Sequence, residues 1–207
     1  QTVYFSSVEQ SNVKNIETTA LQVAEKIKNS EVDKRIRNYI ETTPQEIKIY
    51  AENNFNLSIP LPSNYFITDT TNSCLVLRSD SKNSTQRIVI SSFNLQPSVQ
   101  NIILEQNKIA KSSITSEIEG AYLRIEDRAQ LHVDSLSSTL DDKINIRGIW
   151  KMEGDFMGGS FFTSLIKNPY NENHILVSLY LYAPGINKAN QLLDFEAITN
   201  GLSLISN

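Results

Sequence analysis

The hydrophobic period of the sequence changes near residue 55, and this change restricts the fold more than any other feature. Before it, apolar residues recur at the spacing of an α-helix in two successive runs, Val13, Ile16, Ala20, Val23 and Ile27, then Val32, Ile36, Tyr39 and Ile40. Ser30 and Asp33 stand near the join, where they can cap a second helix. Beyond residue 55, apolar and polar residues mostly alternate, as in half-buried strands. The sequence therefore predicts an α+β protein.

Proline residues mark the starts of several predicted elements. The run Thr43-Pro44-Gln45-Glu46 resembles a capping box, Pro97 opens a second helix, and a final helix is expected to bury Leu192, Phe195, Ile198, Leu202 and Ile205. Candidate strands cover residues 2–5, 56–59, 65–69, 74–78, 87–93, 121–125, 130–133, 144–152, 161–166 and 175–182. We expect a mostly antiparallel sheet with the helices packed on one face.

The two halves of the chain share one order of elements. In each half, two strands joined by a polar turn (residues 79–85 and 167–173) lead through Pro97 or Pro184 into one amphipathic helix. One interpretation is a single α+β unit over residues 1–207 that is duplicated as two ββα-type repeats, 1–118 and 119–207. The other is that the motif is simply common. Both stay open at this point.

Composition excludes several classes of function. A net charge of -4 and an isoelectric point of about 5.3 provide no basic surface for nucleic acid. Cys74 is the only cysteine, so the chain cannot form an internal disulfide or a thiolate metal cluster. His132 and Asp134 share a strand face, and His174 begins another strand, but ordinary surface residues are the simpler interpretation. We therefore expect no cofactor and no metal.

One local sequence stands out, residues 147–161. Four of the seven glycines fall between Gly148 and Gly159, together with the only tryptophan and both methionines. Their spacing matches neither the Rossmann nor the Walker pattern. One interpretation is a loop that binds a partner or ligand, with Arg147, Trp150, Asp155, Phe156, Met157, Gly158, Gly159 and Tyr182 as its binding residues. The alternative is a hairpin whose aromatic and methionine side chains fill the core.

Evidence for catalysis is sparse. Glu153 and Asp155 are two residues apart, so an extended backbone would direct both carboxylates to one face, as in a hydrolase, with His132 as a further candidate. A turn at Gly154 would separate them. No serine lies in a nucleophile elbow. We favour a noncatalytic protein-interaction or structural module, then a glycan- or peptide-binding module, and third a hydrolase using Glu153 and Asp155.

Three stretches carry a resemblance to a known family. They are residues 147–159 around Trp150, Tyr182-Ala183-Pro184, and Leu193-Asp194-Phe195-Glu196-Ala197-Ile198. Together they resemble a family of Bacteroidota envelope lipoproteins that is known as a domain of unknown function. The match extends over most of the chain. It departs from the family pattern at Ser160, where the family has a proline, and at residues 186–189, where the family is rich in lysine and arginine.

The resemblance implies a location rather than a reaction. Family members look longer at the N-terminus and carry a lipoprotein signal there, and this chain begins at Gln1, so we expect an N-terminally truncated family member. It implies a periplasmic or outer-membrane-anchored protein that reaches the membrane only through a lipid anchor on that N-terminal segment. The expected partner is an envelope protein or an envelope polymer.

Overall fold

The structure, a computed structural model of the 207-residue chain, describes residues 7–71, 73–114, 116–126, 128–135, 143–168 and 173–205. Within these ranges the helices are α1 (Ser7–Thr42), α2 (Gln45–Phe55), α3 (Val99–Ser113) and α4 (Ala189–Asn200). The strands are β1 (Leu57–Ser58), β2 (Phe66–Thr71), β3 (Cys74–Ser81), β4 (Ser84–Phe93), β5 (Tyr122–Ile125), β6 (His132–Ser135), β7 (Lys143–Glu153), β8 (Gly158–Lys167), β9 (His174–Tyr182) and β10 (Ser203–Leu204).

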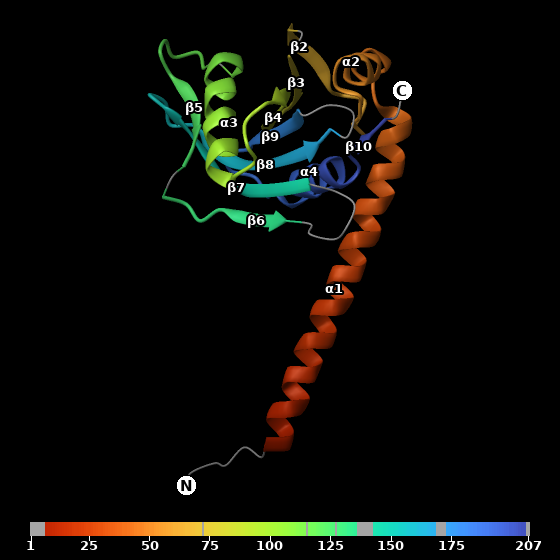
Figure 1. The fold of residues 1–207 in the computed structure, drawn as a ribbon. Helices are drawn as coiled ribbons and strands as arrows, with labels where there is room; N and C mark the ends of the chain where they lie inside the picture. Colours follow the sequence, from red (N-terminus) through yellow and green to blue (C-terminus); the bar gives the residue numbers. More distant parts are fainter. Residues whose placement is uncertain are drawn as a thin grey trace.

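An eight-stranded antiparallel sheet forms the centre of the molecule (Figure 1). Its strands follow the order β2-β3-β4-β9-β8-β7-β5, and β6 also pairs with β7. β1 and β10 form a separate two-stranded sheet. The predicted α+β class with a mostly antiparallel sheet is therefore confirmed. Strands from both halves of the chain share the large sheet, and the proposed duplication stays a prediction.

The helices lie on both faces of the sheet, so the expectation of helices on one face is wrong. Buried side chains form two separate clusters, because successive residues of a strand point to opposite faces. The first cluster packs α1, α2 and α4 against one face, and the second packs α3 against the other. In β9, Leu179 and Leu181 belong to the first cluster and Tyr180 to the second. Figure 1 shows α3 lying across one face and α4 behind the sheet.

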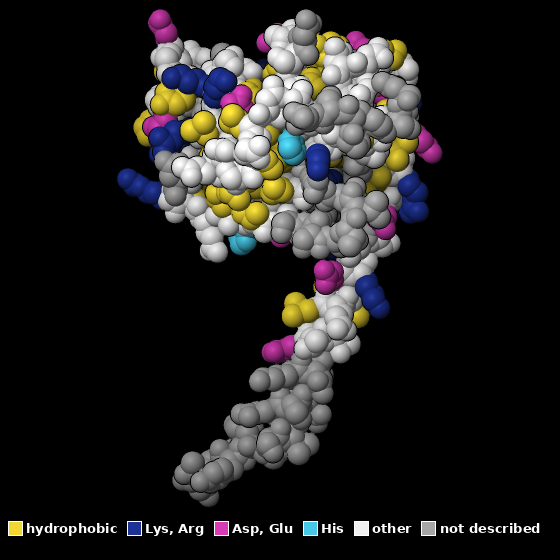
Figure 2. Space-filling view, viewed as in Figure 1, with side chains coloured by type: hydrophobic (Ala, Val, Ile, Leu, Met, Phe, Trp, Pro, Cys, Tyr) yellow, Lys and Arg dark blue, Asp and Glu magenta, His cyan; other side chains and the backbone are white. Residues whose placement is uncertain are grey.

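α1 is one continuous helix of 36 residues, and the predicted restart at Ser30 and Asp33 is wrong. At 1.5 Å per residue it is about 54 Å long. Residues 17–30 are all exposed, including Leu21, Val23 and Ile27, and Figure 1 shows the helix extending away from the body before Lys28, which binds Glu196 of α4 over 2.7 Å. Figure 2 shows hydrophobic, acidic and basic side chains next to each other there. Among the α1 side chains that the structure describes, from residue 17 onward, those packed in the core lie in the last part of the helix, such as Val32 and Tyr39.

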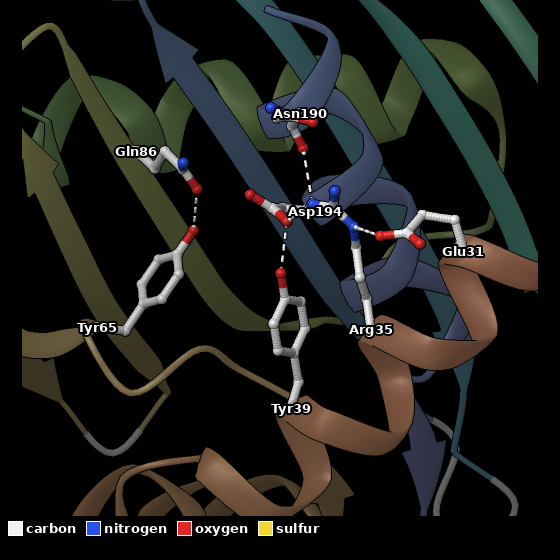
Figure 3. A network of polar contacts seen from close by, with 7 residues as sticks. All are labelled: Glu31, Arg35, Tyr39, Tyr65, Gln86, Asn190 and Asp194. Carbon is white, nitrogen blue, oxygen red and sulfur yellow. Dashed lines mark hydrogen bonds and ion pairs between the residues drawn. The ribbon is translucent and has the colours of Figure 1, made fainter. Parts of the chain in front are cut away.

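A polar network fastens α1 to α4 (Figure 3). Asp194 of α4 accepts hydrogen bonds from Arg35 and from the Tyr39 hydroxyl, the latter over 2.5 Å. Arg35 also donates to the Asn190 carbonyl and to Glu31, each over 3.2 Å. Burial and the hydrogen bond to Asp194 raise the pKa of Tyr39. The network fixes the direction in which α1 leaves the body.

Four further expectations are corrected or fall outside the described residues. The final helix ends at Asn200 and is followed by β10, so it does not continue to Ile205. The polar turn of residues 79–85 is shorter than expected, because β3 and β4 extend through Ser81 and Ser84. The predicted strand at residues 2–5 and much of the second polar turn lie outside the described residues.

Candidate functional site

Most of the glycine-rich stretch is strand rather than loop. β7 and β8 form a hairpin in which residues 154–157 make the turn, with Gly154 at a φ of 86°. The Met152 amide donates to the Met157 carbonyl over 2.8 Å, and the Phe156 amide donates to Asp155 Oδ1 over 2.6 Å. The stretch therefore follows the strand rule, under which alternate side chains point to opposite faces.

This alternation separates Arg147 from Trp150. The Arg147 guanidinium lies over the Phe162 ring, 5.0 Å from its centroid, and its Nη2 lies 3.7 Å from the Glu196 carboxylate of α4. Trp150 belongs to the cluster on the opposite, α3-covered face. The predicted binding residues therefore do not form one site.

Trp150 is packed into the sheet surface, with only 3% of its area exposed. Its indole N–H donates to the Leu181 carbonyl over 3.3 Å, and its ring lies 6.4 Å from that of Tyr182 between centroids. Gly159 makes this placement possible. A Cβ atom there would lie 1.8 Å from the Leu181 carbonyl oxygen and 3.0 Å from the indole nitrogen. The core-filling interpretation therefore describes Trp150 correctly.

Trp150 nevertheless also borders a cavity of about 590 Å³, which we call the hairpin cleft. Of the predicted binding residues, four line the cleft, Trp150, Asp155, Met157 and Tyr182. The others that line it are Arg78, Thr85, Arg87, Ile114, Ser116, Glu117, Ile118, Leu123, Met152 and Tyr180. Phe156, Gly158 and Gly159 are not among the lining residues, and Phe156 at the hairpin turn is fully exposed.

Two arginines that the sequence analysis missed stand at one end of the cleft. Arg78 and Arg87 are direct cross-strand partners on β3 and β4. Arg78 pairs with Asp80 over 2.7 Å, whereas Arg87 makes no hydrogen bond or ion pair with another described residue and feels Asp80 only at longer range. Burial and the neighbouring Arg78 lower the pKa of Arg87. The available signal was their position, since Arg78 ends one predicted strand and Arg87 begins the next, on either side of the predicted polar turn.

The carboxylates proposed for hydrolysis are used in separate contacts. Glu153 makes ion pairs with Lys151 over 3.0 Å and Arg124 over 3.3 Å. Asp155 accepts from the Ser116 hydroxyl over 2.8 Å and from the Phe156 amide. His132 pairs with Arg147 in the sheet register and does not line the cleft. The three side chains therefore do not converge around one described cavity.

The described residues also provide no metal site and no membrane span. No group of three histidine, cysteine or acidic side chains within them has the geometry to hold a metal ion. Burial raises the pKa of Cys74, which keeps its thiol protonated. In the part of the chain that the structure describes, no helix has the length and apolar character required to cross a bilayer.

Comparison with known proteins places the chain in a family. The family model of a domain of unknown function, DUF4837, matches residues 43–201. The chain belongs to this family. The match covers the sheet, the hairpin cleft and α2 to α4, whereas α1 precedes it. No curated protein matches the sequence.

Two solved structures are similar to this one. The Ran-binding protein Mog1p of Saccharomyces cerevisiae is 7% identical, with a TM-score of 0.45, over 73% of this chain and 91% of Mog1p. A single-substitution mutant of Mog1 gives a TM-score of 0.46 at 7% identity, over 73% of this chain and 92% of the other.

Proposed function

We propose that this DUF4837 protein is a noncatalytic binding module of the cell envelope and that its ligand occupies the hairpin cleft. The ligand is a small molecule or a short segment of a peptide or glycan. The envelope location is supported by the sequence resemblance to envelope lipoproteins, whose lipid anchor would lie N-terminal to α1.

The observation that carries this proposal is the hairpin cleft itself. Its volume of about 590 Å³ lies within the range of small-molecule sites, which span roughly 300 to 1,000 Å³. Trp150, Tyr180 and Tyr182 supply aromatic surface, and a few polar groups lie among apolar residues. This mixture is typical of ligand sites, in which apolar walls provide affinity and a few polar groups provide orientation.

A noncatalytic role agrees with the contacts of the acidic residues. A general acid or base must reach the substrate and needs a pKa suited to proton transfer. Asp155 instead caps the hairpin turn and accepts from Ser116. Glu153 is occupied by two ion pairs. Neither carboxylate is available as the second member of a catalytic pair.

The proposal is tested with pyrenebutanol, an uncharged aromatic probe. Trp150 is the only tryptophan, so energy transfer from Trp150 to pyrene reports binding near the cleft. Thr85→Phe places a large side chain in the cleft, and Thr70→Phe makes the same change at an exposed position of β2. We expect Thr85→Phe to weaken binding at least about tenfold and Thr70→Phe to leave it unchanged. Equal binding by both variants would contradict the proposal.

A second candidate function, protein interaction, is favoured by Phe156. Its side chain has an exposed fraction of 108% at the tip of the β7–β8 hairpin. A fully exposed aromatic residue on a tight turn is the kind of anchor that interfaces use. Affinity capture from native membranes should then lose a specific partner in Phe156→Ser but not in Leu104→Ser, which changes another exposed apolar residue, on α3. Identical partners in both variants would remove this candidate.

A further inference from the structure

We infer that the hairpin cleft recognises an amphipathic monoanion, with its carboxylate at Arg87 and its apolar body against Tyr182 and Trp150. The inference rests on the proposed binding function and adds the chemical class of the ligand. It is carried by the charge, the burial and the cross-strand register of the residues around the cleft.

The first step is the uncompensated charge of Arg87. Its side chain is half-buried and makes no hydrogen bond or ion pair with another described residue, although the Asp80 carboxylate acts on it at longer range. Arg78 stands directly opposite on β3, and like charges in this position repel each other. A partly desolvated guanidinium needs an acceptor, because its five N–H donors otherwise lose their hydrogen bonds to water. A carboxylate bound in the cleft would provide two acceptors in matching geometry.

The second step is the charge that the ligand must carry. Asp80 is bound to Arg78 over 2.7 Å and also accepts from Thr85. These hydrogen bonds outweigh the effect of burial and lower the pKa of Asp80, so it stays ionised. Asp80 thus pairs directly with Arg78 and acts on Arg87 only at longer range, so the positive charge of Arg87 is left without an ion-pair partner among the described residues. That charge matches one carboxylate, and the acidic Glu117 and Asp155, which also line the cleft, would repel a ligand with more negative charge.

The third step is a row of residues that crosses the sheet two residues along β4 from Arg87, which itself lies opposite Tyr180. By register, Thr85 on β4 lies beside Tyr182 on β9, and Gly159 on β8 lies beside Trp150 on β7. Adjacent strands are about 4.8 Å apart, so β4 and β7 are separated by about 14 Å. Gly159 contributes no side chain, so the Trp150 and Tyr182 rings approach to 6.4 Å between their centroids and form one apolar surface. An apolar body several carbons long can lie along this row while its carboxylate stays at Arg87.

The inference is tested with two probes that differ only at the head group. Pyrenebutyrate carries a carboxylate where pyrenebutanol carries a hydroxyl, and both are read by energy transfer from Trp150. The wild-type protein is expected to bind the acid about tenfold more tightly than the alcohol, as a charge-assisted hydrogen bond would provide. Arg87→Met should lower the affinity for the acid to that for the alcohol in the same variant, and Arg87→Lys should retain part of the preference.

Lys82→Met is the matched control, because it removes one positive charge from the exposed turn between β3 and β4. It should leave the preference for the acid intact. Equal loss in Lys82→Met and Arg87→Met would overturn the inference in favour of a general charge effect. Loss of both probes in Arg87→Met would overturn it too, since Arg87 would then only shape the cleft. If the wild type binds the alcohol but shows no preference for the acid, the inference fails and the binding function stands. If neither probe binds the wild type, the binding function fails first.

Discussion

Replacing Gly159 by alanine is expected to destabilise the protein by about 2 to 4 kcal/mol. The added Cβ would lie 1.8 Å from the Leu181 carbonyl oxygen, whereas such C···O contacts are normally about 3.3 Å. Both atoms belong to paired strands, so no flexible side chain can yield and β8 and β9 must separate locally. Overpacking costs about 1 to 3 kcal/mol, and the indole hydrogen bond of Trp150 to the same carbonyl adds about 1 kcal/mol.

The assay is urea unfolding followed by circular dichroism and by the fluorescence of Trp150. Because this is the only tryptophan and is 3% exposed, displacement of its ring should shift the emission to longer wavelength in the folded variant. Gly120→Ala is the matched control, since Gly120 has a φ of 80° but a Cβ added there would meet no atom within 4 Å. Backbone strain alone should cost about 1 kcal/mol there. Equal costs for the two variants, with unshifted fluorescence, would refute the reasoning.

Three further predictions concern stability. Tyr39→Phe should cost about 1 to 2 kcal/mol in urea unfolding, because Asp194 loses a charge-assisted hydrogen bond while packing is retained. Burial raises the pKa of Tyr39, Tyr65 and Tyr180 above the ordinary value of 10.0, so stability should be constant with respect to these groups below about pH 10 and fall above it. As the pH rises above 10, the unfolded state releases the tyrosine protons before the folded state does. The free energy of unfolding then falls by about 1.4 kcal/mol per pH unit for each such tyrosine. In urea unfolding curves measured over a series of pH values, Tyr39→Phe should make this fall less steep. Phe156→Ser should change the midpoint of thermal unfolding little, with a cost below about 0.5 kcal/mol, because the ring has no packing to lose.

The element types were predictable because hydrophobic period directly reports local geometry. The alternation through residues 144–152 and 175–182 correctly placed β7 and β9. The faces occupied by the helices were not predictable in the same way. Period identifies which side of α3 or α4 is apolar, but it does not identify the side of the sheet to which a helix returns. That choice depends on contacts between distant residues, such as Phe195 of α4 with Phe162 of β8.

The length of α1 was misjudged for a different reason. Ser30 and Asp33 are good capping residues, but a cap is needed only where a helix ends. Here Val32 and Tyr39 pack against the body while Arg35 and Tyr39 bind Asp194. These tertiary contacts hold the helix across the join and outweigh the local preference for a break.

The candidate site was only partly predictable, because strand parity and register decide which residues meet. Arg147 and Trp150 are three residues apart, and an odd separation on a continuous strand directs them to opposite faces. The prediction that both residues bind one ligand therefore required a flexible loop, and the structure has a strand there instead. Arg78 and Arg87 are nine residues apart, and only the two-residue turn of the β3–β4 hairpin makes them direct partners.

The two interpretations of the glycine-rich stretch are compatible once the sheet is built. Trp150 is packed against Leu181 over the space left by Gly159, which fixes the orientation of its indole. The same ring borders the hairpin cleft together with Tyr182. A rigidly held aromatic wall loses little conformational entropy when a ligand binds, so burial of Trp150 favours recognition rather than opposing it. The hypothesis of an exposed, adaptable apolar loop is thereby restricted to Phe156, while Trp150, Met152 and Met157 supply a preformed surface in the cleft that Arg87 also lines.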